Sequence, residues 1–351
     1  MLCDTVVRAA ETWNNPFGIK KARGADAAFL RKWLAESAAL VRNSERFVLD
    51  QDAIRVITHV QESKPATLLA GTGIVRVPHQ RVWVEFGSDE FLSALNEIGT
   101  RNTWSKYGQG GHVGLLIKAT DQTFQRGIYQ VVFQETARSC PVRYPIAVAF
   151  DFSNPDENTV HRFRAEKNIL MEGSSIRSFS ETNPGIAHRH HENKEHEQAL
   201  VDLNNLFLVL HHQKACGVLN AVAQGRDIDQ AYLHRKWVRL VGFYTRTVMS
   251  CLMLLNSRNL AQTTFMSAPA INRSLCKGQT QVRLSHGKVS INLSKVQRNR
   301  DIAGSSDSAD TPLHSVRGHW KVRKTGVFYW RPFDRGNPAQ GTITRNYHVT
   351  A

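Results

Sequence analysis

The sequence predicts an α+β protein: N-terminal helices, a central antiparallel sheet, a helical middle region and a small C-terminal β-hairpin or three-stranded module. Three observations support this. Apolar residues recur at the helical period within residues 20–60 and 195–256, short β-branched and aromatic runs fill residues 72–152, and aromatic and basic residues alternate over residues 316–331. With 351 residues, of which 41% are hydrophobic, the chain is long enough for one large domain or two ordinary ones.

The N-terminal helices are expected to form a layer on the sheet. From Ala27 to Phe47, apolar residues recur close to the helical period, and basic residues fall largely between them. A second amphipathic helix is expected from Asp50 to Val60, with Ile54, Ile57 and Val60 on one face. Core packing accounts for both segments, and no site is expected there.

The central part of the chain changes to strand patterns. Short runs that favour strands occupy residues 74–78, 81–86, 113–118, 127–134 and 144–151. Short turns between such runs favour an antiparallel sheet. The glycine-rich loop over residues 107–112 lacks a Walker lysine and the dinucleotide-binding spacing, so it is interpreted as a hairpin connection.

The middle region is predicted to be helical over Leu200–Leu210 and Ala231–Asn256, both strongly apolar. It follows a run rich in histidine and glutamate. If that run is helical, His188, His191 (or Glu192) and Glu195 share one face and could bind zinc or a related metal. The run is not a His-Glu-x-x-His motif, and an ordinary solvated helix start is the preferred explanation, so no cofactor is expected.

The domain organisation follows from composition. Residues 1–302 are expected to form the α+β core, with further strands at residues 281–284 and 289–293. Residues 303–312 are small and polar, which is typical of a linker. Residues 313–351 would then form a basic, aromatic β module whose hairpin gains a third strand from residues 342–349, because an isolated hairpin is marginally stable in water.

The two faces of this hairpin are expected to differ. Alternation within the first strand puts Val316, Trp320 and Val322 on one face, and Arg317, His319, Lys321 and Arg323 on the other. In the second strand it separates Phe328 and Trp330 from Val327, Tyr329 and Arg331. An aromatic side formed by Trp320, Phe328 and Trp330 would anchor the module, and a cationic side would bind a ligand.

The charge of the chain points to a polyanionic partner. Lys and Arg number 45 against 30 Asp and Glu, a formal net charge of +15, and the pI is about 9.9. Nucleic acid, RNA more than DNA, is the simplest partner. The residues expected to bind it are Arg317, His319, Lys321, Arg323, Lys324, Tyr329, Arg331 and Arg335.

Two other functions fit the same module. A metal-independent ribonuclease could use His314 and His319 as acid and base, with Arg317 stabilising the charge on phosphate. Alternatively, the basic surface could bind an acidic protein, such as a ribosome-associated factor. The sequence contains no complete catalytic motif, so it does not decide between a protein that binds nucleic acid and a nuclease that cleaves it.

The cysteines and the hydropathy pattern bear on location. Five cysteines, an odd number, occur without a Cys-x-x-Cys pair, which argues against a disulfide framework or a zinc ribbon. No apolar run reaches the roughly 18 residues that span a bilayer, and the N-terminus lacks the pattern of a signal peptide. A cytoplasmic protein without a membrane partner is therefore expected.

The C-terminal module carries a resemblance. The segments Val316-Arg317-Gly318-His319-Trp320 and Lys324 to Gly336 look like the C-terminal signature of proteins carried by phages and mobile elements, among them the VA2 group of type V anti-CRISPR proteins. The strand over residues 82–86 and the apolar run Leu206–Leu210 resemble that group more weakly. The basic Lys321–Lys324 turn departs from it. The resemblance implies a mobile-element protein in a bacterial host cell that interferes with, or regulates, nucleic-acid machinery, with a CRISPR effector as one protein partner that it suggests.

Overall fold

The structure is a computed structural model, and it describes the greater part of the chain. The described residues are 1–12, 25–61, 65–97, 111–135, 141–153, 174–178, 202–203, 205–212, 215–216, 218, 244–257, 261–267, 284–291, 312–316, 319–323, 326–330, 333–335 and 337–343.

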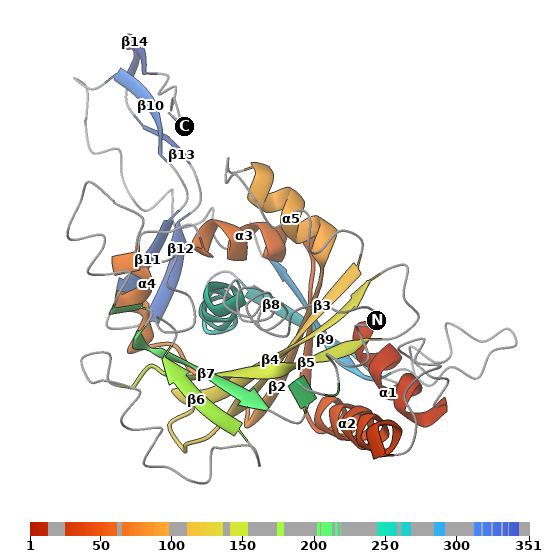
Figure 1. The fold of residues 1–351 in the computed structure, drawn as a ribbon. Coiled ribbons are helices and arrows are strands. Elements are labelled where there is room, and N and C mark those ends of the chain that lie inside the picture. Colours follow the sequence, from red (N-terminus) through yellow and green to blue (C-terminus); the bar gives the residue numbers. More distant parts are fainter. Residues whose placement is uncertain are drawn as a thin grey trace, which may run out of the picture.

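A nine-stranded mixed sheet is the centre of the fold, with the strand order β6-β7-β5-β4-β3-β2-β1-β9-β8 (Figure 1). Its strands are β1 (Glu45–Leu49), β2 (Arg81–Gly87), β3 (Gly111–Ala119), β4 (Arg126–Glu135), β5 (Val142–Asp151), β6 (Ser174–Ser178), β7 (Phe207–His212), β8 (Ala261–Met266) and β9 (His286–Ile291). Strands β2 to β5 pair antiparallel with their chain neighbours. Strand β1 pairs parallel with both β2 and β9.

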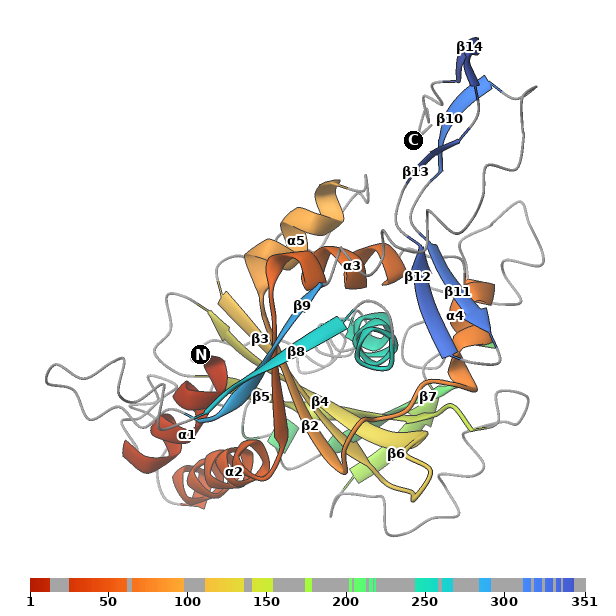
Figure 2. The same ribbon diagram turned by 180° about the vertical axis from the view of Figure 1, so that it is seen from behind.

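Helices cover both faces of this sheet. Helices α1 (Leu2–Thr12) and α2 (Ala25–Arg42) lie on one face, while α3 (Gln51–Gln61), α5 (Ser88–Glu97) and a helix over residues 244–255 lie on the other (Figures 1 and 2). Strand β2 shows why helices pack on both faces of the sheet: its apolar side chains point to both faces. Val82, Val84 and Phe86 belong to the larger hydrophobic cluster, whereas Trp83 belongs to the cluster formed with α1 and α2.

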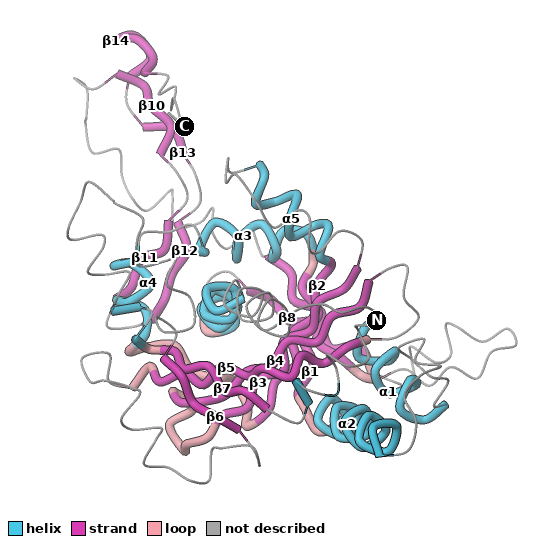
Figure 3. Tube along the Cα trace, in the orientation of Figure 1, coloured by secondary structure: helices cyan, strands magenta, loops and turns pink. Residues whose placement is uncertain are grey.

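The helix over residues 244–255 lies inside the curve of the sheet (Figure 3). Its residues are buried or half-buried along its whole length. Two buried side-chain hydrogen bonds fix its rotation: the Tyr129 and Thr245 hydroxyls lie 3.0 Å apart, and the Thr247 hydroxyl donates to Gln61 Oε1 over 2.8 Å. Burial raises the pKa of the Tyr129 phenol, so this group stays protonated.

Glu85 fixes α1 on the opposite face. Its buried carboxylate accepts hydrogen bonds from the backbone nitrogens of Leu2 and Cys3, at 2.5 and 3.0 Å, and from the Trp83 indole at 3.1 Å. A negative charge at a helix N-terminus satisfies free N–H groups and complements the helix dipole. The buried charge thus has three donors, and it holds the first helix on β2.

The C-terminal strands form two further small sheets. Strands β11 (His319–Arg323) and β12 (Gly326–Trp330) pair antiparallel as the expected hairpin. Strands β10 (Pro312–Val316), β13 (Phe333–Arg335) and β14 (Asn337–Ile343) form a separate three-stranded sheet, which extends away from the core (Figure 1). Of the predicted linker, residues 303–312, the first nine residues lie outside the described residues, and Pro312 is the first residue of β10.

The α+β class is confirmed, with three corrections to the predicted core. The sheet is mixed rather than antiparallel, because β1 adds two parallel ladders. Phe47 lies in β1 and not in a helix, since α2 ends at Arg42. The run Leu200–Leu210 was predicted to be helical, but Phe207–His212 is strand β7. Both faces of β7 are covered, so its apolar run has no strand periodicity to reveal it.

Three smaller boundaries also move. Residues 74–78 are not a strand; they follow α4 (Pro65–Thr72) as an irregular segment. Residues 261–266 form strand β8, where no strand was predicted. The strand expected at residues 289–293 is β9, which begins earlier, at His286. Within the described parts of the chain, no helix is long and apolar enough to cross a membrane.

A close contact between β2 and β3 gives the first testable prediction. A Cβ added at Gly114 would overlap Cη2 of the buried Trp83 ring, so Gly114→Ala must displace this ring. We expect it to lower the free energy of unfolding by about 1–3 kcal/mol, measured by urea denaturation. Gly73→Ala is the control, because Gly73 is exposed and a Cβ added there would have no neighbour within 4 Å. Equal effects of the two substitutions would contradict the packing described.

Candidate nucleic-acid interface

The hairpin β11–β12 has a register that places its residues in pairs. His319 lies opposite Trp330, Lys321 opposite Phe328, and Arg323 opposite Gly326. Directly opposed residues of an antiparallel pair lie on the same face of the ladder. Positions 319, 321 and 323 therefore share a face with positions 328 and 330.

This register corrects the predicted faces. The expected aromatic side combined Trp320 with Phe328 and Trp330, but Trp320 lies opposite Tyr329, and Val322 lies opposite Val327. Trp320 is therefore on the other face from Phe328 and Trp330. Alternation within each strand was predicted correctly; the phase between the two strands was not, because it depends on the register and no single strand shows it. The cationic positions thus share their face with two aromatic positions.

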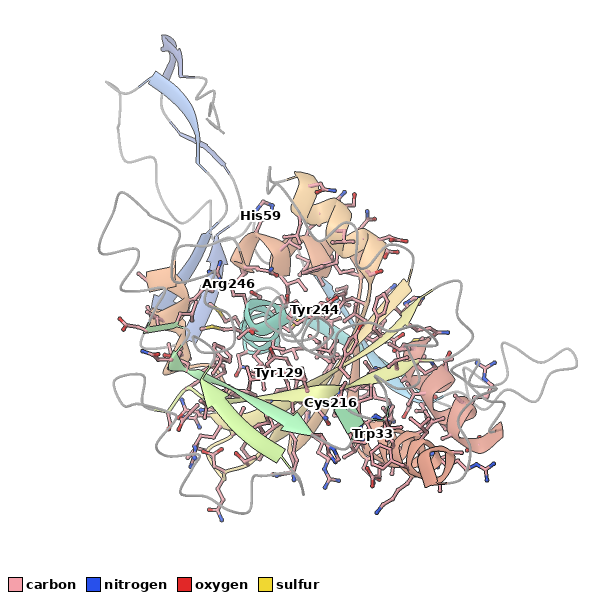
Figure 4. The ribbon with its side chains drawn as sticks, viewed as in Figure 1. Trp33, His59, Tyr129, Cys216, Tyr244 and Arg246 are labelled. Atoms are coloured by element: carbon pink, nitrogen blue, oxygen red, sulfur yellow. The ribbon has the colours of Figure 1, made fainter. Side chains whose placement is uncertain are left out.

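The hairpin lies against the main domain. Strand β11 contacts α4 and the end of α3, so the module is docked on the core on that side. Figure 4 shows two basic side chains near this region, His59 on α3 and Arg246 on the helix over residues 244–255, and both are half-buried. Phe328 of β12 is half-buried as well. The hairpin therefore has support from the helical layer in place of a third strand.

The third strand expected for the hairpin is found elsewhere. Strand β14 pairs parallel with β10, with Leu313 opposite Thr342 and His314 opposite Ile343. It ends at Ile343, and residues 344–349 lie outside the described residues. Residues 342 and 343, which were predicted to extend the hairpin, therefore pair with β10 instead; for residues 344–349 the extension stays a prediction. Strands β10 and β11 belong to different sheets, and residues 317–318 between them lie outside the described residues.

The ribonuclease candidates are divided between these sheets. His314 lies in β10, where it is opposite Arg335 of β13, whereas His319 lies in β11. Arg317, Lys324 and Arg331 lie outside the described residues. Direct pairing brings His314 and Arg335 together, and it does not pair His314 with His319.

The metal candidates His188, His191 and Glu195 also lie outside the described residues. Among the residues that the structure does describe, no group of three or more histidine, cysteine or acidic side chains could hold a metal ion. Burial raises the pKa of the thiols of Cys3 and Cys251, and it raises that of Cys216 to about 11, so these thiols are protonated at neutral pH.

Among the described side chains of the sheet, Arg143 is the most buried lysine or arginine, and no sequence motif marks it. It lies in an apolar strand, and its guanidinium stacks on Trp33 of α2, with its Cζ 3.5 Å from the ring centroid. A lone basic residue within an otherwise apolar strand is the only signal that the sequence offers for it.

Comparisons with known proteins returned no match: no family model, no curated protein and no solved structure is similar to this chain.

The register of the hairpin can be tested with an engineered disulfide. Val322 and Val327 are directly opposed, so cysteines at both positions are expected to fall within bonding range. We expect the two cysteines of the variant with Val322→Cys and Val327→Cys to form a disulfide on oxidation. After alkylation, the intact mass should then show no more modified thiols than in the wild type. Val322→Cys with Phe328→Cys is the control, because those positions lie on opposite faces. Oxidation of the control pair, but not of the first pair, would mean that the register is shifted.

Proposed function

We propose that this chain is a nucleic-acid-binding regulator that acts through the cationic–aromatic face of the β11–β12 hairpin. This face is defined here by positions 319, 321, 323, 328 and 330. In the anti-CRISPR-like version of this proposal, the protein works in the cytoplasm of a bacterial host as a product of a mobile element. The observation that carries the proposal is the register, which puts basic and aromatic positions on one surface.

The charge distribution supports a polyanion. Residues 313–351 contain seven lysines and arginines and one acidic residue, Asp334, so this segment alone has a net charge of +6 out of the total of +15. Lysine and arginine side chains bind phosphates and release condensed counterions, which supplies most of the affinity of such proteins. A small segment with that charge density is an electrostatic footprint for RNA or DNA.

The aromatic positions support single-stranded substrates. Bases that are not paired can stack on aromatic rings, and each stacked base typically contributes about 1–3 kcal/mol. The corrected faces make Trp330 the stacking candidate, in place of Tyr329, with Lys321 and the half-buried Phe328 on the same face. Single-stranded RNA combines accessible bases with phosphates, so it fits this surface better than a closed duplex.

The first test concerns charge. Lys321→Ala with Arg323→Ala should weaken the binding of a single-stranded RNA at least about tenfold at low salt, and it should reduce the slope of log K against log salt by about 0.7 for each lost phosphate contact. Fluorescence anisotropy across a salt series measures both quantities. The matched control is Lys118→Ala with Lys288→Ala, which removes two exposed positive charges from strands of the large sheet, outside the hairpin. Equal losses in the two variants would show that only net charge matters, and absence of binding by the wild type at low salt would refute the proposal.

The second test concerns stacking. Trp330→Leu is expected to weaken the affinity for RNA by about 1–3 kcal/mol while the salt slope stays unchanged, because it removes a ring and no charge. Tyr329→Leu lies on the other face and is expected to leave the affinity unchanged. If Tyr329→Leu weakens RNA binding and Trp330→Leu does not, the binding surface is the face that contains Tyr329. The same labelled RNA, examined on a denaturing gel, shows whether the protein cleaves it.

A further inference from the structure

Strand β8 is the last strand of the large sheet, and β9 is its one neighbour among the described strands (Figure 2). Its side chains are exposed from Gln262 to Met266, on both faces of the strand. Phe265 is 65% exposed and Met266 41%, and they are the two exposed large hydrophobic residues of the part of the chain that the structure describes. An exposed strand edge beside exposed apolar side chains is a surface on which another chain can pair.

The hydrogen bonds of β9 determine which backbone groups of β8 are left free. The Val289 carbonyl accepts from the Asp50 backbone N–H over 3.1 Å, so residue 289 points its backbone groups toward β1. Successive residues of a strand alternate in this respect, so Lys288 and its partner Thr264 bond to each other within the β8–β9 ladder. The backbone N–H and C=O groups of residues 261, 263 and 265 therefore point outward. Among the described residues, no hydrogen bond reaches this outer edge.

Phe265 has little to pack against within its own chain. The outward positions lie on the face of the larger cluster, because Thr263 is opposite Val289, which is buried in that cluster. The residue opposite Phe265 is Gly287, which has no side chain. The space above Gly287 is taken by Thr263, whose Cγ2 would lie 2.6 Å from a Cβ added there. Ala261 packs at the margin of the cluster. The edge therefore presents a large apolar side chain at one end and a small one at the other.

Strand β8 also lacks the features that normally keep strand edges apart. Its sequence, Ala261 to Met266, contains no charged residue and no proline, and its ladder to β9 has no bulge. In a chain with a formal net charge of +15, a neutral strand is where a second copy meets little repulsion. An acidic partner strand, in contrast, would find no cation on β8. The charge pattern therefore favours a second copy over an acidic protein at this edge.

We propose that β8 pairs antiparallel with β8 of a second copy of this chain, with Thr263 at the two-fold axis. Hydrogen-bonded pairs form between outward-pointing residues, so residue 263 pairs with its own counterpart and residue 261 pairs with residue 265. This register places the Phe265 ring beside Ala261 of the second copy, a large side chain against a small one. It uses every outward backbone group of β8, and it continues the large sheet across the axis.

The first test is sedimentation equilibrium of the full chain after nuclease treatment. We expect a mass that rises from 39.5 kDa toward twice that value as the protein concentration rises from about 1 to 100 μM. Thr263→Lys is expected to raise the dissociation constant of the dimer at least about tenfold, because it sets two like charges opposite each other at the axis. Ser93→Lys is the matched control: it adds the same charge at an exposed position of α5, and it should leave the dimer unchanged.

Salt distinguishes this dimer from two chains that are bridged by nucleic acid. Strand β8 carries no charge, so added salt should leave the dissociation constant unchanged, whereas bridging through phosphate contacts weakens steeply with salt. The variant with Lys321→Ala and Arg323→Ala should dimerise like the wild type, which separates this surface from the hairpin. If that variant is monomeric, or if salt dissociates the dimer, the association runs through the hairpin and the proposal is overturned.

A disulfide tests the register without relying on a loss of binding. Thr263→Cys is expected to crosslink two copies on mild oxidation, since directly opposed Cα atoms lie about 5.5 Å apart. Ala261→Cys should not crosslink, because residue 261 lies opposite residue 265 of the second copy and far from its own counterpart. More crosslinking of Ala261→Cys than of Thr263→Cys would contradict the pairing at Thr263.

Two further results would overturn the proposal. One is a wild type that stays monomeric up to roughly 100 μM, which would leave the edge to an extended segment of another protein. The other is an unchanged dimer in Thr263→Lys, once urea unfolding has shown that this variant is folded.

Discussion

The pairing of β1 on both of its sides holds the large sheet together. This strand has five residues, and it joins β2 to β9 through two parallel ladders, so the β8–β9 edge has no other ladder to the rest of the sheet among the described strands. Its end also starts the next helix: the Asp50 backbone donates to Val289, and the Asp50 carboxylate caps α3 by accepting from Ala53 over 2.9 Å. The position of α3, and with it the support under the hairpin, follows from where β1 ends.

The local patterns predicted elements well where one face of an element meets the core. Helix α3 has Ile54, Ile57 and Val60 at the expected spacing, and strands β2 to β5 lie where their alternating runs were recognised. Strand β1 could not be predicted in this way, because it is short, follows a helix closely and begins with two charged residues, Glu45 and Arg46. Its parallel partners are determined by tertiary packing, which no window of local sequence contains.

The hairpin and the contacts of the Trp33 ring show the same limit of local sequence at the level of side chains. Each strand of the hairpin was recognisable from its composition, but which residues share a face depended on pairing Lys321 with Phe328. The contacts of the Trp33 indole come from three separate elements, because α2, β5 and β7 each contribute one residue to them. Such a set of contacts has no spacing motif, since its residues are neighbours only after the sheet and the helix have packed together.

The ladder between β1 and β9 also determines the order in which the protein can fold during synthesis. Strands β2 to β5 form an up-and-down meander from one continuous stretch, so they can pair as soon as that stretch has left the ribosome. Phe47 of β1 can pair with Gly287 of β9 only after most of the chain has been translated. Until then one edge of β1 has no partner and can meet another nascent chain. Closure of this ladder is a contact of high sequence separation, and we expect it to be a slow, late step of folding.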